Sequence, residues 1–74
     1  MARHVTLYVQ TACARCDALR ADLAGRGVVF TEVDVTLHPE VVPELMKLTK
    51  GRRLVPVLVE GGRITVAPDG GSEF

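Results

Sequence analysis

The stretch "HVTLYVQTACARCDAL", residues 4–19, decides the fold, because it changes from a strand pattern to a helix pattern across two cysteines. Over residues 4–10, valine and leucine alternate with mostly polar side chains, and this period of two predicts a strand. Tyr8 falls among the alternating polar positions, which indicates that both faces of the strand are at least partly covered. Residues 16–27 place leucines four apart and end in glycines, as a helix does.

The only two cysteines of the chain, Cys13 and Cys16, therefore lie where a first strand meets a first helix. The first turn of a helix has unpaired N–H groups and partial positive charge, which stabilise a thiolate and lower its pKa. Cys16 lies one helical turn further on and shares a helix face with Cys13. We expect Cys13 to be the exposed attacking sulfur and Cys16 the buried resolving one, with the charge of Arg15 near both.

Strand patterns and helix patterns also follow one another along the rest of the chain. Residues 28–35 predict a second strand, and Pro39 opens a helix over about 39–49, with Thr36 or His38 as its cap. Two further strands, 55–60 and 63–67, flank a Gly-Gly turn that is typical of a hairpin. The order βαβαββ predicts an α/β fold with a mixed four-stranded sheet, in which the first two strands are parallel and the hairpin adds an antiparallel edge.

Length and composition restrict the function. The 74 residues make one small domain, and 47% of them are hydrophobic, nearly all aliphatic, which suits an α/β core. Nine basic and nine acidic side chains leave no basic excess, so we expect no nucleic-acid partner. We also expect no membrane contact, because the N-terminus has no apolar run long enough for a signal peptide or a membrane span. We predict a monomeric cytoplasmic protein whose partner is a small molecule or another protein.

In the cytoplasm a close cysteine pair indicates redox chemistry or metal binding rather than a permanent disulfide. A disulfide that closes so short a loop would add little stability. Zinc could draw on His4 and His38 besides the cysteines, but the spacing H-x8-C-x2-C-x21-H matches no zinc finger. Two alternatives to an enzyme stay open. One is a metal-binding module that uses Cys13 and Cys16, with a dimer supplying four thiolates, and the other is a truncated or non-catalytic fragment.

A second motif is "RRLVPV", residues 52–57. Proline cannot donate a hydrogen bond to a sheet, so Pro56 either begins the strand or lies on an edge. Alternatively, the Val55–Pro56 bond is cis and turns the N–H and C=O of Val55 toward an extended substrate. Arg52 and Arg53 could bind a carboxylate or simply face solvent.

The segments "YVQTACARC" (8–16) and "GRRLVPVLVEGG" (51–62) resemble the glutaredoxins of the thioredoxin-like superfamily, and the resemblance covers essentially the whole chain. It is most similar to a small bacterial branch in which some members carry selenocysteine at the first redox position. The resemblance implies a thiol–disulfide oxidoreductase that acts on glutathione mixed disulfides or a protein disulfide and is recycled by a thiol reductant. It implies no bound cofactor and no metal, with glutathione as a candidate co-substrate.

The resemblance also assigns site residues. Cys13 would be the nucleophile and Cys16 the resolving cysteine. The expected substrate contacts are Gln10, Arg15, Arg53, Val55, Pro56, Gly70 and Gly71. Gln10 stands where glutaredoxins usually carry lysine, and the last helix of the family is absent or truncated. We expect a single domain over residues 1–70, and residues 71–74, "GSEF", are either encoded by cloning sites or a truncated C-terminus.

Overall fold

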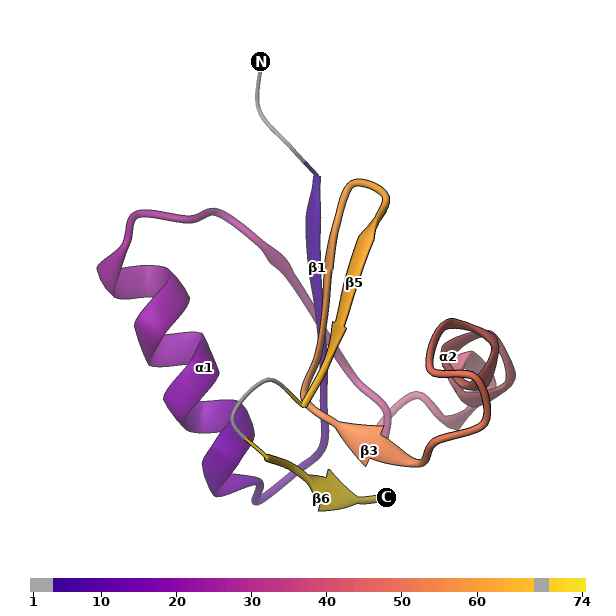
Figure 1. Ribbon diagram of the computed structural model, residues 1–74. Helices are drawn as coiled ribbons and strands as arrows, with labels where there is room; N and C mark the ends of the chain where they lie inside the picture. Colours follow the sequence, from indigo (N-terminus) through magenta and orange to yellow (C-terminus); the bar gives the residue numbers. More distant parts are fainter. Residues whose placement is uncertain (1–3, 68–69) are drawn as a thin grey trace.

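Strand β1 (Val5–Val9) lies inside a four-stranded sheet and is paired along both edges. The computed structural model describes residues 4–67 and 70–74, so residues 1–3 and 68–69 of the expected domain lie outside the described residues. The sheet order is β2-β1-β4-β5, and Figure 1 labels β1 and the edge strand β5. The other three strands are β2 (Thr31–Asp34), β4 (Val57–Glu60) and β5 (Arg63–Val66). β1 runs parallel to β2 and antiparallel to β4, which confirms the predicted mixed sheet.

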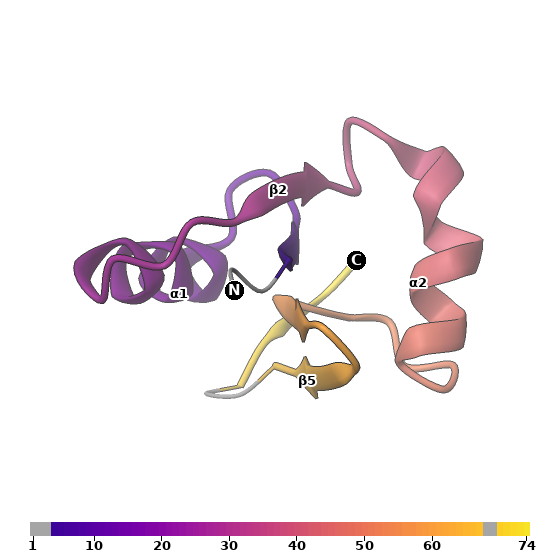
Figure 2. The same ribbon diagram turned by 90° about the horizontal axis from the view of Figure 1, so that it is seen from above.

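Helices cover both faces of this sheet, as Figure 2 shows from above. Helix α1 (Ala14–Gly25) connects β1 to β2, and a 3-10 turn η1 (Pro39–Val41) leads into helix α2 (Val42–Leu48) on the opposite side. Tyr8 is only 9% exposed, and its burial, together with the charge of Glu44 on α2, raises the pKa of its hydroxyl. Tyr8 lies on one face of the sheet, and the valines and leucine that alternate with it lie on the other.

The core fills the two layers between sheet and helices. In α1 the buried residues Cys16, Leu19 and Leu23 are spaced three and four apart, so they form one stripe along the helix. Leu7 on β1 and Leu45 on α2 are fully buried on either side of the sheet. No helix within residues 4–67 and 70–74 has the length and apolar character needed to cross a membrane.

Three predicted elements differ from the structure. The second strand covers only Thr31–Asp34 of the predicted 28–35. The second helix begins as a 3-10 turn, and neither candidate cap caps it with its side chain: His38 precedes the turn without a capping hydrogen bond, and Thr36 lies earlier, in the turn after β2. The predicted strand 55–60 is interrupted at Pro56, because proline cannot donate to a ladder. The Val55–Pro56 bond is cis.

The interruption produces a separate short pairing. Strand β3 (Leu54–Val55) precedes Pro56 and pairs antiparallel with β6 (Ser72–Glu73), which follows the two glycines at 70–71. Figure 1 shows β3 and β6 at the same end of the molecule as the start of α1. The Gly61–Gly62 turn lies at the other end, where the N–H of Gly61 donates to the carbonyl of His4 at 3.2 Å. The predicted hairpin is thus confirmed, whereas the β3–β6 pair was not predicted.

Candidate functional site

Cys13 is the N-cap of α1, and its sulfur faces the first turn of the helix. The Cys16 N–H donates to Cys13 Sγ at 3.1 Å, which uses one of the N–H groups that the helix start leaves unpaired. The two cysteines are joined in a disulfide with their Cα atoms 5.2 Å apart. The predicted position of the pair at the strand–helix junction is therefore confirmed. An N–H bond to Sγ would also favour a thiolate over a thiol once the disulfide is reduced.

The expected exposure of Cys13 is wrong. Cys13 is 2% exposed and Cys16 is 0% exposed, so both members of the disulfide are buried. Two features bury Cys13. Locally, Cys13 Sγ turns inward onto the helix start. In the tertiary structure, Cys13 belongs to the same hydrophobic cluster as Val55. Exposure could not be predicted from a cap position alone, since it depends on what packs over the turn.

The turn that leads into Cys13 is held by polar contacts with the end of β2. The Thr11 hydroxyl donates to Asp34 Oδ2 at 2.9 Å, and the Thr11 N–H donates to Thr36 Oγ1 at 3.3 Å. Ala12, next to Cys13, has φ 58°, the left-handed region that disfavours a residue with a side chain. These bonds and this backbone angle fix the direction in which the chain enters α1.

Asp34 also accepts from the backbone of its own turn, with the Thr36 N–H at 2.8 Å and the Leu37 N–H at 3.4 Å. Partial desolvation alone would raise the pKa of Asp34. The hydrogen bonds from Thr11, Thr36 and Leu37 outweigh it and hold the pKa of Asp34 below its ordinary value. Sequence analysis missed Thr11 and Asp34, although Asp-x-Thr directly after a strand is a signal for an Asx turn.

Five of the expected substrate contacts meet beside the disulfide. Val55 and Pro56 are buried and joined by the cis bond that was one of the two alternatives for this motif. A Cβ on Gly71 would lie 2.3 Å from the Val55 carbonyl oxygen, so only glycine fits there. A Cβ on Gly70 would lie 3.7 Å from the Arg15 guanidinium carbon. The segment at 70–71 thus passes between Arg15 and Val55.

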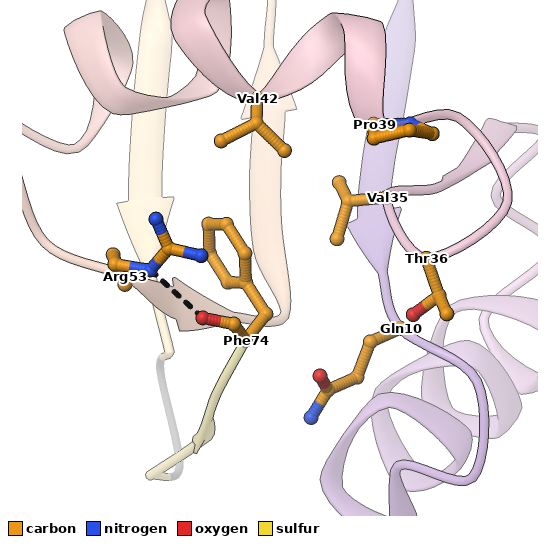
Figure 3. A pocket seen from close by; sticks show the side chains of 7 residues that line it. All are labelled: Gln10, Val35, Thr36, Pro39, Val42, Arg53 and Phe74. Atoms are coloured by element: carbon orange, nitrogen blue, oxygen red, sulfur yellow. Dashed lines mark hydrogen bonds between the residues drawn. The ribbon is translucent and has the colours of Figure 1, made fainter.

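The other two expected contacts, Gln10 and Arg53, line a pocket of about 360 Å³. Its further walls are Val35, Thr36, Pro39, Val42 and Phe74 (Figure 3). Arg53 is engaged there, because its Nε donates to the Phe74 carbonyl at 2.8 Å and its guanidinium lies 5.0 Å from the centre of the Phe74 ring. Phe74 is a pocket residue that sequence analysis did not select, and no local pattern singles it out.

The metal-binding alternative finds no support in the geometry. Within the part of the chain that the structure describes, no three His, Cys, Asp or Glu side chains are grouped so as to hold a metal ion. His4 and His38 are exposed and lie against Thr6 and Glu40. The two histidines therefore do not complete a ligand set with the cysteines.

Comparisons with known proteins agree with this geometry. A family model described as glutaredoxin matches residues 5–65. The NrdH-redoxin of Escherichia coli superposes with a TM-score of 0.76 at 27% sequence identity, over 85% of this chain and 80% of that one. The glutaredoxin grx-1 of Archaeoglobus fulgidus superposes with a TM-score of 0.76 at 21% identity, over 96% and 77%. No curated protein matches the sequence.

Proposed function

Because the chain belongs to the glutaredoxin family, we propose that it exchanges disulfides by a dithiol route in which Cys13 attacks and Cys16 resolves. The observation that carries the assignment is the N–H of Cys16 donating to Cys13 Sγ at 3.1 Å. This bond and the helix start stabilise negative charge on Cys13, whereas Cys16 lies inside the first turn. Cys13 is therefore the better thiolate and Cys16 the nearer second thiol.

The exchange balances in two steps. The Cys13 thiolate attacks one sulfur of the substrate disulfide, so the bond from Cys13 to substrate forms, the substrate disulfide breaks, and the released thiolate takes a proton. The Cys16 thiolate, having lost its own proton to solvent, then attacks Cys13 Sγ, so the bond from Cys13 to the substrate breaks and the second substrate sulfur leaves as a thiolate that takes a proton from solvent. The substrate gains two electrons and the protein is left with the Cys13–Cys16 disulfide. A thiol reductant returns two electrons and two protons to regenerate the dithiol.

We favour a protein disulfide as substrate and a thioredoxin-type reductant over glutathione mixed disulfides. The similar Escherichia coli protein is described as glutaredoxin-like with a thioredoxin-like activity profile. In this chain Gln10 stands where the family usually carries lysine, so the pocket at Arg53 has one positive charge fewer for the carboxylates of glutathione.

The Cys16→Ser variant tests the assignment of roles. We expect the reduced variant, mixed with glutathione disulfide and quenched with an alkylating agent, to carry one mixed disulfide at Cys13 that persists in the intact mass. The matched Cys13→Ser variant should form its adduct at Cys16 far more slowly, because Cys16 lacks the cap position and the N–H bond that stabilise a thiolate at Cys13. Equal rates in the two variants would contradict the assignment.

The reductant is tested with the wild-type protein and insulin as a general protein disulfide. We expect turnover with thioredoxin reductase and NADPH to exceed turnover with glutathione, glutathione reductase and NADPH. Faster turnover in the glutathione system would reverse the preference while leaving the roles of the cysteines intact.

A further inference from the structure

The backbone edge next to the disulfide is already occupied. Val55 pairs with Ser72 and Leu54 with Glu73, and the Phe74 N–H donates to the Arg53 carbonyl at 3.2 Å. In an antiparallel ladder, hydrogen-bonded and non-hydrogen-bonded pairs alternate. Since Arg53 and Phe74 are hydrogen-bonded, the pair two residues along, Val55 with Ser72, is of the hydrogen-bonded kind. The N–H and C=O of Val55, which the sequence motif assigns to an extended substrate, thus face residue 72.

The side chain at the end of this segment fills a matching pocket. The Phe74 ring lies against the Arg53 guanidinium, and Val42 and Val35 face it across the pocket (Figure 3). The carbonyl of Phe74 accepts from Arg53 Nε at 2.8 Å. A ring held between a cation and aliphatic walls, with its own carbonyl anchored, is how a groove binds one aromatic residue of an extended peptide.

The same segment also crosses the region of the disulfide. Gly70 lies beside Arg15, and Gly71 is pressed against the Val55 carbonyl. Arg15 lies between Cys13 and Cys16 in the sequence, and Cys13 is only 2% exposed. A substrate that reaches Val55 has to replace residues 71–72 there.

We propose that Ser72–Phe74 act as a competing pseudo-substrate on the β3 edge, and that the partner displacing them is an extended peptide with an aromatic side chain two residues after the one paired with Val55. The partner inserts its aromatic ring between Arg53 and Val42 and exchanges backbone hydrogen bonds with Val55. The docking site deepens the proposed function. It rests on that function in one respect, because the docked peptide is taken to be part of the protein whose disulfide is exchanged.

The Phe74→Ala variant of the whole chain tests the competition. Loss of an exposed cation–π contact should weaken the docked segment about two- to fivefold. We therefore expect dithiothreitol to reduce the Cys13–Cys16 disulfide about two- to fivefold faster, and the peptide acetyl-Gly-Ser-Glu-Phe-Gly-amide to bind tighter by a similar factor. Binding is followed by the amide chemical shift of Val55. Ile64→Ala, an exposed apolar residue on the far edge strand β5, is the matched control and should change neither value.

Two further measurements test whether the groove selects an aromatic side chain. The peptide with alanine in place of phenylalanine should bind about two- to fivefold more weakly, and Phe74→Leu, which keeps an apolar side chain, should fall between wild type and Phe74→Ala. Equal binding of the two peptides, or unchanged reduction and binding in Phe74→Ala, would overturn the proposal. The mixed-disulfide trap in Cys16→Ser does not depend on peptide docking, so its failure would remove the proposed function without removing the docking site.

Discussion

The two ends of the sheet use the same backbone conformation with different residues. At the cysteine end, which comprises residues 10–16, 55–56 and 70–71, Ala12 has φ 58°. At the hairpin end, which comprises residues 60–63, Gly61 has φ 59°. Glycine adopts this region freely, whereas alanine pays about 1–2 kcal/mol for it. The hairpin end is thus locally relaxed, and the cysteine end keeps a strained residue next to its reactive sulfur.

The glycines show the same contrast in packing. A Cβ on Gly62 would meet no atom within 4 Å, whereas one on Gly71 would lie 2.3 Å from the Val55 carbonyl oxygen and 2.8 Å from the Ala67 Cβ. A turn at the hairpin end needs only a suitable backbone. The cysteine end is built by close approach of segments that are distant in sequence, so its geometry is fixed by packing rather than by turn preference.

The largest difference in the free energy of unfolding between the two ends is expected when each of these two glycines is replaced by alanine. Gly71→Ala should lower the free energy of unfolding by about 1–3 kcal/mol, because the new Cβ overlaps the Val55 carbonyl oxygen and the Ala67 Cβ, so the packed segments have to move apart. Gly62→Ala should leave it within about 0.5 kcal/mol of wild type, because the space there is open. Urea denaturation of both oxidised variants gives the comparison. Equal stability of Gly71→Ala and wild type would mean that residues 71–74 do not hold this position.

A smaller change in the free energy of unfolding, of opposite sign at the two ends, is expected when alanine and glycine replace one another at the two positions with φ near +60°. Ala12→Gly should raise the free energy of unfolding by about 0.5–1 kcal/mol, since relief of the left-handed strain exceeds the added entropy of the unfolded chain. Gly61→Ala should lower it by about as much, because no steric contact adds to the backbone cost. Thermal unfolding of both variants checks the signs. A loss of stability in Ala12→Gly would show that the Ala12 side chain contributes more than its backbone angle costs.

The smallest effect concerns the polar contacts of the cysteine end. Removal of the Thr11 hydroxyl in Thr11→Val should raise the pKa of Asp34 toward its ordinary value, and Thr65→Val on β5, at the opposite edge of the sheet, should leave the pKa of Asp34 unchanged. A lowered carboxyl pKa stabilises the folded protein above the unfolded pKa of 3.8, and this stability is lost as the pH falls through the folded value.

Carboxyl-carbon NMR titration of Asp34 measures the shift directly. Because asparagine does not titrate, Asp34→Asn should lose stability less steeply than wild type as the pH falls below about 4. An Asp34 pKa that is the same in Thr11→Val and wild type would assign the lowering to the backbone N–H groups of Thr36 and Leu37 and to the Thr36 side chain.

Much of the fold could be predicted because its signals are local. The alternation over residues 4–10, the leucines at 19 and 23, and the Gly61–Gly62 turn each determine an element within a few residues. The limits of the second strand and second helix were less accurate, because the ends of elements depend on which neighbours supply hydrogen bonds. The cysteines at the strand–helix junction could be predicted for the same local reason.

By itself the sequence determined the order of elements, the parallel crossover between the first two strands, and the place of Cys13 at a helix start, since periodicity and capping act within one or two turns of chain. Only the tertiary structure decided the burial of Cys13, the cis bond at Pro56, the Thr11–Asp34 contact and the β3–β6 pair. These features join residues up to 23 positions apart, or depend on what packs over them. No local preference encodes such contacts, because their energy exists only once the sheet has brought the segments together.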